Sequence, residues 1–270
     1  MEQVNLELLA LMRPENYVLF LILLIFRPMG MLYGFTLFSW GLGAGFMMRV
    51  VIAAAFGLVP FWNDAEKFIM FAISADLQTM IITLMIEFSI GFLVGALASS
   101  PFHAMKYAGA IIDTFRGENN SSIEDPSGGT LTTLGLLYFI CAAILFTQAG
   151  GFYVLTENLY TSYTIWPVGG NTATLTESAW LQATIMLSRA VVAGIAIAAP
   201  LLIILYSIEF LFGVATKLAP RFGLYENAFL AKNLATVIAL VLFSGYILRI
   251  SDEAVGFAYR ATNTVDWVLQ

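Results

Sequence analysis

The sequence predicts an all-α membrane protein. Of its 270 residues, 60% are hydrophobic and only 11% are charged, whereas a soluble domain carries about 25% charged residues. A soluble protein of this length cannot hide such an apolar excess in its core, because much of its surface must still meet water. The apolar residues also gather into long segments, so we expect helices that are covered by lipid or by other subunits.

Six segments approach the roughly 20 apolar residues that a membrane-spanning helix needs. They are Tyr17–Phe38, Phe46–Trp62, Leu77–Ala98, Leu131–Leu155, Leu181–Phe212 and Ala228–Ile250. We expect a shorter, semi-polar helix over Phe102–Phe115 and a short amphipathic helix over residues 1–16. Since neither a linker nor a repeat divides the chain, we predict one domain over residues 1–270.

Charged residues interrupt several of these segments. An unpaired charge that faces lipid at the bilayer centre costs at least ~3 kcal/mol. We therefore predict that four of them are buried inside protein: Arg49, Glu87, Arg189 and Glu209. We expect Arg49 and Glu87 to form an ion pair. Lys232 and Arg249 lie near segment ends, where a long side chain can equally reach the membrane surface.

Glycine and proline mark places where helices come close together or bend. Three pairs have the GxxxG spacing: Gly30 and Gly34, Gly41 and Gly45, and Gly91 and Gly95. Glycines at this spacing share one helix face and let a second backbone approach. That backbone can belong to a partner subunit or to this chain, and the sequence leaves both open. Pro28 and Pro200 fall inside apolar segments, where each is expected to kink or break its helix.

Charge and reactive residues argue against two classes of function. A net charge of −6 disfavours nucleic acid, whose phosphates need clustered Lys and Arg. Cys141 and His103 are the only residues of their kinds, so no Cys/His cluster suggests a metal, and no nucleophile–base motif suggests catalysis. We therefore expect no cofactor and no enzymatic activity. A secondary transporter is the alternative, because intramembrane charges and broken helices also build transporter sites.

Residues 100–130 form a polar stretch between two apolar segments. Within it, Glu118–Gly129 contains two Asn, three Ser, one Pro and two Gly, a composition typical of loops. An ordinary solvated loop is the simplest interpretation. The glycines and the proline also permit a tight, reversible fold-back.

The order of residues in this stretch is more specific than its composition. It reads PF-x(6)-G-x(3)-D-x(2)-RG, formed by Pro101, Phe102, Gly109, Asp113, Arg116 and Gly117, and is followed by Asp125–Pro126. This run resembles the SctT family of type III secretion export proteins, which is similar to the flagellar FliR protein. Further likenesses are EFSIG with Glu87 and Gly91, Gly150–Gly151, SYTIWP at Ser162–Pro167, and the stretch Ala198–Pro220. The RG dipeptide and SYTIWP favour the injectisome branch, which serves virulence.

The resemblance implies kinked helical hairpins that assemble into a helical, multi-subunit export gate. The implied partners are SctR-like and SctS-like subunits, together with SctU-like and SctV-like components, membrane lipid and unfolded exported proteins. It also implies a multi-pass protein of the bacterial inner membrane, raised partly toward the periplasm. Residues 117–129 would then act as a plug in the closed pore. The residues expected to form this plug are Gly117, Glu118, Asn119, Asn120, Ser121, Ser122, Asp125, Pro126, Gly128 and Gly129.

Overall fold

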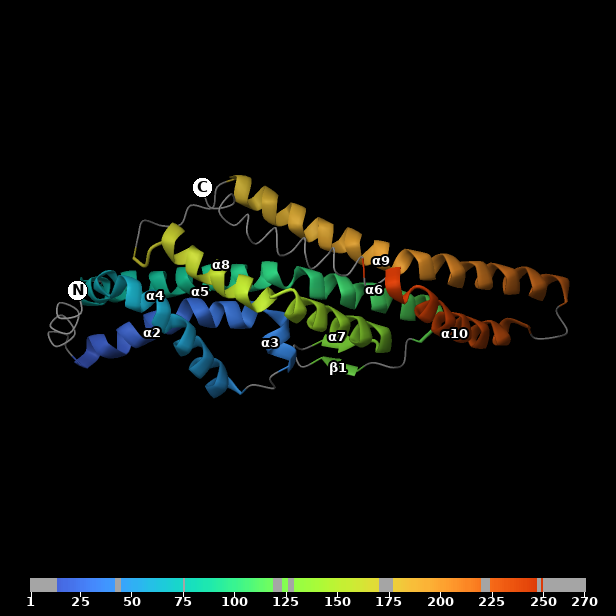
Figure 1. Ribbon diagram of the computed structural model, residues 1–270, viewed down its shortest axis with the longest axis horizontal. Helices are drawn as coiled ribbons and strands as arrows, with labels where there is room; N and C mark the ends of the chain where they lie inside the picture. The colour runs from blue at the N-terminus through green and yellow to red at the C-terminus, as the bar shows by residue number, and fades with distance from the viewer. Residues whose placement is uncertain are drawn as a thin grey trace. The chain divides into compact units, whose positions relative to one another are not determined.

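The computed structural model describes residues 14–41, 45–74, 76–118, 123–125, 129–169, 177–219, 224–246 and 249. The expected helix over residues 1–16 lies almost entirely outside this range. The described chain is helical apart from one small hairpin (Figure 1). An all-α membrane protein is therefore confirmed.

The described chain forms two compact units that interleave along the sequence. The first takes residues 1–99, 150–185 and 259–270, and the second takes residues 100–149 and 186–258. The chain changes units at Ser99–Ser100 and Ala149–Gly150, between consecutive helices, and at Ile185–Met186, inside a helix.

Five helices lie wholly within the described part of the first unit. They are α2 (Pro14–Gly34), α3 (Thr36–Gly41), α4 (Phe46–Ser74), α5 (Leu77–Ala98) and α8 (Gly151–Ile165). Helix α2 packs against α4 and α5, and α8 packs against both α4 and α5. A series of edge-on and tilted rings runs through this core, joining Phe20 to Phe61, Phe61 to Phe68, and Phe68 to Tyr163.

The second unit contains α6 (Ser100–Arg116), α7 (Thr133–Gln148), α10 (Leu224–Leu242) and most of α9 (Glu177–Leu218). Between α6 and α7 lie β1 (Ile123–Asp125) and β2 (Gly129–Leu131). The two strands pair antiparallel, with Glu124 opposite Thr130. Helix α6 packs against α7, and α10 also contacts α6.

Fewer helices have the length of a membrane span than the sequence predicts. Within the described residues, only Leu77–Ala98 and Ser188–Leu218 are both long and apolar enough. The number rises to four if the two halves of α4, and likewise α7 with α8, each count as one broken span. Six segments of the sequence approach the length of a span, but several of them are divided or shortened in the fold.

The two prolines expected to kink or break their helices do not end them. Pro28 lies inside α2 and Pro200 inside α9, and both helices continue past them. The expected span Leu131–Leu155 is instead divided at Gly150, whose φ of 74° is left-handed. Glycine adopts this conformation without a steric penalty, so α7 ends and α8 starts there.

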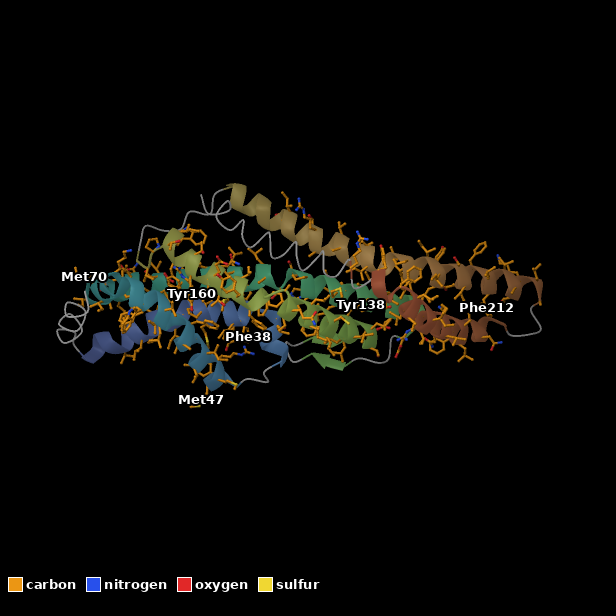
Figure 2. All side chains as sticks on the ribbon, viewed as in Figure 1. Phe38, Met47, Met70, Tyr138, Tyr160 and Phe212 are labelled. Carbon is orange, nitrogen blue, oxygen red and sulfur yellow. The ribbon has the colours of Figure 1, made fainter. Side chains whose placement is uncertain are left out.

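Large apolar side chains remain exposed along most helices of the chain. Met47 is 82% exposed and Met70 is 55% exposed, and both lie at the periphery of the side chains in Figure 2. Soluble proteins rarely expose so much apolar surface. These faces therefore need lipid or neighbouring proteins to cover them.

Candidate functional site

A buried ionic network lies at the centre of the first unit. The guanidinium of Arg27, on α2, has no exposed surface, and Glu87, on α5, is 2% exposed. Arg27 donates from Nε to Glu87 Oε2 at 2.6 Å and from Nη2 to Glu87 Oε1 at 2.9 Å. This two-point geometry is the strongest way in which arginine binds a carboxylate.

Helix α8 and its end complete the surroundings of Arg27. Nη2 also donates to the Trp166 carbonyl oxygen at 2.8 Å, and Nη1 donates to the Ser162 hydroxyl at 3.3 Å. The guanidinium carbon lies 4.0 Å from the centre of the Tyr163 ring. A buried arginine needs its donors satisfied, and two separate stretches of sequence, one around Glu87 and one at Ser162–Trp166, supply the acceptors here.

These partners belong to motifs that carry the family resemblance. Glu87 begins EFSIG, and Ser162, Tyr163 and Trp166 belong to SYTIWP. A Cβ at Gly91, the glycine of EFSIG, would overlap the Arg27 carbonyl oxygen. Both motifs are thus explained by one requirement, which is to bring α5 and α8 against a buried arginine.

The predicted partner of Glu87 was wrong. Arg49 is only half-buried, and its guanidinium carbon lies 4.6 Å from the centre of the Tyr33 ring, as in a cation–π contact. Both Arg27 and Arg49 lie in apolar segments, so their positions in the sequence do not show which of them pairs with Glu87. Pro28, beside Arg27, was the one hint in the sequence, because it lies in the helix that packs closely against α5.

Two other charges that were expected to be buried are not buried by this chain. Arg189 is exposed, and the side chain of Glu209 is 42% exposed and lies 3.7 Å from Lys232 Nζ. Lys232 also donates to the Phe115 carbonyl oxygen at 3.0 Å. The lysine therefore turns toward protein groups, whereas from its sequence position it could equally have reached the membrane surface.

Two GxxxG pairs face one another within the first unit. Added Cβ atoms at Gly30 and Gly34 would meet the backbone of α5, and added Cβ atoms at Gly91 and Gly95 would meet the backbone of α2. On two successive turns of each helix, a glycine therefore lies directly against the backbone of the other helix. Of the two open possibilities, contact within the chain is the one observed for these four residues. Gly45 of the remaining pair has nothing within 4 Å of an added Cβ.

Ser99 fixes the end of the same helix contact. Its buried hydroxyl accepts from the Thr36 N–H at 2.8 Å, and lies 3.0 Å from the carbonyl oxygens of Gly34 and Gly95. The serine therefore satisfies backbone groups where α2 stops and α3 starts. Backbone groups at helix ends need such partners when they are buried.

The aspartate of the sequence motif starts helix α7. Asp113 is completely buried, and its Oδ2 accepts from the Leu134 N–H at 2.8 Å. The Thr132 hydroxyl accepts from the Gly135 N–H at 3.2 Å. Two N–H groups in the first turn of α7 thereby gain acceptors, and one of these acceptors, Asp113, lies on the preceding helix. A carboxylate at a helix N-terminus is also electrostatically favourable.

The rest of the motif brings α6 and α7 together. Phe102 is fully buried, and its ring centre lies 5.7 Å from that of Phe139 and 5.2 Å from that of Phe146. A Cβ at Gly109 would overlap the backbone nitrogen of Gly135. Pro101 is buried as well. The PF…G…D pattern therefore defines a helical hairpin.

The segment predicted to be a loop contains a strand. Ile123–Asp125 pairs with Gly129–Leu131, although the composition of Glu118–Gly129 predicted no regular structure. Ile123 and Thr130 are β-branched and lie on either side of the sequence Pro-Ser-Gly, a pattern that can signal a hairpin. Six of the expected plug residues lie outside the described residues: Asn119, Asn120, Ser121, Ser122, Pro126 and Gly128.

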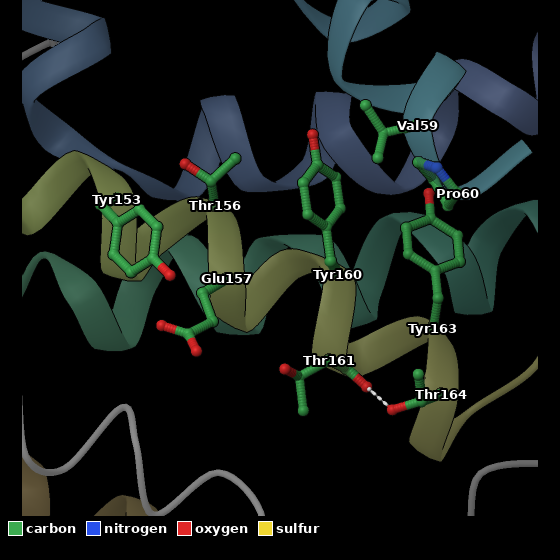
Figure 3. A pocket seen from close by; sticks show the side chains of 9 residues that line it. All are labelled: Val59, Pro60, Tyr153, Thr156, Glu157, Tyr160, Thr161, Tyr163 and Thr164. Carbon is green, nitrogen blue, oxygen red and sulfur yellow. Dashed lines mark hydrogen bonds between the residues drawn. The ribbon is translucent and has the colours of Figure 1, made fainter. Parts of the chain in front are cut away.

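A cleft of about 520 Å³ lies between α4 and α8 of the first unit (Figure 3). The side chain of Tyr163 points toward Pro60 on α4, and the carboxylate of Glu157 points the other way. The Tyr163 hydroxyl is buried without a hydrogen-bond partner, while its ring covers Arg27. None of the described residues gather into a group of three or more His, Cys, Asp or Glu that could hold a metal.

The family described as bacterial export proteins, family 1, matches residues 18–257. The chain belongs to this family. The match includes the Arg27 network, the α6–α7 hairpin and both long apolar helices, so the family resemblance drawn from the motifs is confirmed.

Known relatives of the chain come from several enteric bacteria. It is 28% identical to the surface presentation of antigens protein SpaR of Shigella sonnei, over 60% of this chain and 62% of that protein. It is 28% identical to the Yop proteins translocation protein T of Yersinia pestis, over 67% of this chain and 70% of that protein. SpaR of Salmonella typhimurium is 25% identical, over 81% of this chain and 79% of that protein. The match to the Shigella sonnei protein thus spans less than two thirds of its length.

Membership in bacterial export protein family 1 sets the broad function. The family is described as bacterial export proteins. Together with the apolar helices, this description indicates an inner-membrane protein.

Proposed function

We propose that the chain supplies part of the wall and the plug of a type III secretion pore, through which unfolded proteins leave the bacterial cell. The observation that carries this proposal is the polar β hairpin between α6 and α7. It joins two packed helices of the second unit, and the family motif builds both helices that hold it. A plug must be polar enough to leave lipid and short enough to move aside, and this hairpin is both.

The exposed apolar faces support assembly with other subunits. Only two described helices clearly have the length and composition of membrane spans, yet large apolar side chains are exposed on most of the others. Helices that do not cross the bilayer still need those faces covered. SctR-like and SctS-like subunits would cover them, with SctU-like and SctV-like components nearby. Such an assembly can rise partly toward the periplasm, because protein takes the place of lipid around it.

The chain needs no cofactor for this role. Export would be driven by other components, and this subunit would form a passive path for the substrate. A secondary transporter, the alternative function, has no support from the family match. Purification in mild detergent separates the two: a gate subunit emerges in a large complex with its partners, a transporter as a monomer or homo-oligomer.

Replacing residues 119–128 with a short Gly/Ser linker tests the plug directly. The change keeps Gly117 and Glu118 at the end of α6 but removes β1. In purified complexes placed in vesicles, leakage of ions and small solutes should rise several-fold, because the polar segment no longer fills the closed pore. Shortening residues 171–176, which join α8 to α9, is the matched control and should leave leakage unchanged. Unchanged leakage from an intact complex that lacks 119–128 would reject the plug.

A further inference from the structure

The end of helix α6 is tied down where the hairpin leaves it. The Gly117 N–H donates to the Thr114 carbonyl at 3.1 Å, and the Glu118 N–H donates to the Asp113 carbonyl at 3.0 Å. Gly117 has a φ of 88°. This is the Schellman ending of a helix, which needs glycine in the left-handed conformation. The turn fixes the direction in which the hairpin departs.

An ionic cluster then holds the first residue of the hairpin. Arg116 Nη2 lies 2.7 Å from Asp113 Oδ1 and also pairs with Glu118 Oε2. The Thr133 hydroxyl lies 3.4 Å from Glu118 Oε1. Glu118 therefore bonds to the end of α6 through Arg116 and to the start of α7 through Thr133. The two ends of the hairpin are joined through one carboxylate.

Helix α10 reaches the same place from another direction. Lys232 Nζ donates to the Phe115 carbonyl at 3.0 Å, in the last turn of α6. An added Cβ at Gly117 would lie 3.4 Å from the Phe229 ring, which is three residues before Lys232. Residues three apart share a helix face, so one face of α10 contacts the hairpin base at two points.

The lysine is held by protein groups on more than one side. Its side chain is only 13% exposed, and Glu209 on α9 lies 3.7 Å from its Nζ. Cations near a helix C-terminus are favoured because the last carbonyls carry partial negative charge. Lys232 therefore joins α10 and α9 to the point at which the hairpin begins.

We propose that Lys232 and the Arg116–Glu118 pair are positioning residues that hold the base of the hairpin, Gly117 and Glu118, to α6 and α7, so that displacement of α10 frees this base and the strand β1 that follows it. The inference rests on the proposed plug role for its consequence in secretion, but the position of the segment can be measured by itself. A lysine that only stabilised the fold would change the stability of the complex without changing exposure of the hairpin.

The test measures how fast a thiol on the hairpin reacts with a membrane-impermeant maleimide. The assembled complex carries Glu124→Cys on β1, with Cys141→Ala to remove the native thiol. Adding Lys232→Met should raise the labelling rate about tenfold, since a hydrogen bond from a charged donor is lost. Lys232→Arg should keep most of the wild-type rate. Lys217→Met removes the same charge from an exposed site in the last turn of α9 and should change nothing.

We call Lys232 and the Arg116–Glu118 pair the clamp. Each outcome tests the clamp separately from the plug. Faster labelling in Lys232→Met, with normal complex yield, supports the clamp even if removal of 119–128 leaves leakage unchanged. Unchanged labelling overturns the clamp even if that removal opens the pore. If Lys232→Met lowers complex yield, Glu118→Gln replaces it. That variant breaks the Arg116 pair at a partly exposed site and must also raise labelling for the proposal to stand.

Discussion

Replacing Arg27 with methionine should destabilise the chain by ~3–5 kcal/mol, because it leaves the Glu87 carboxylate buried without a counter-ion. The measurement is denaturant unfolding of the chain in detergent, followed by circular dichroism. Arg27 has no exposed surface, and Glu87 is 2% exposed, so water cannot replace the missing partner. The double variant Arg27→Met with Glu87→Leu should recover much of the loss, since apolar residues of similar size can replace a buried pair.

Arg49→Met is the matched control for this experiment. It removes the same charge from an apolar segment of the same unit, but Arg49 is half-buried and lies against the Tyr33 ring. A cation–π contact of this kind contributes about 0.5–1 kcal/mol. Equal losses for Arg27→Met and Arg49→Met, or purely additive losses for Arg27 and Glu87, would show that the ionic network is not the centre of the unit.

Gly91→Ala should destabilise the chain by about 1–3 kcal/mol or more, because the new methyl group would overlap the Arg27 carbonyl oxygen. Alanine otherwise favours helices over glycine by about 1 kcal/mol. Gly213→Ala, on α9, has nothing within 4 Å of its Cβ and should be neutral or stabilising. The two variants are therefore expected to have opposite signs in the same unfolding assay.

Gly91→Ala also tests whether Gly91 packs within the chain or against a partner subunit. The α2–α5 contact is made within one chain, so the loss should appear whether or not partner subunits are co-expressed. Full stability of the variant chain alone, with failure only in assembly, would mean that Gly91 faces a partner and that the observed contact is wrong.

Local patterns in the sequence predict individual helices well. The apolar run Leu77–Ala98 matches α5 at both ends, and the semi-polar run Phe102–Phe115 lies within α6. Both depend only on hydrophobic residues and their neighbours. The family motif was equally readable, because it requires particular residue types at fixed spacing along one helix and at the start of the next.

Long-range partners could not be predicted in the same way. Arg27 and Glu87 are 60 residues apart, and Arg49 was an equally plausible partner until the helices were placed. The break at Gly150 was hidden for a related reason, since glycine is tolerated inside apolar helices. The division into two units was also invisible, because two of the passages between them fall between consecutive helices and another lies inside α9.

Photo-crosslinking of a stalled export substrate tests the central claim most directly. A photoreactive amino acid at position 124, on β1, is placed in the assembled complex while a substrate fused to a tightly folded domain is being exported. If the chain forms the plug and wall of the pore, illumination should join the substrate to this position, and the same substrate without its secretion signal should give no product. An assembled, secreting complex that yields no crosslink from position 124 to the stalled substrate would contradict the account.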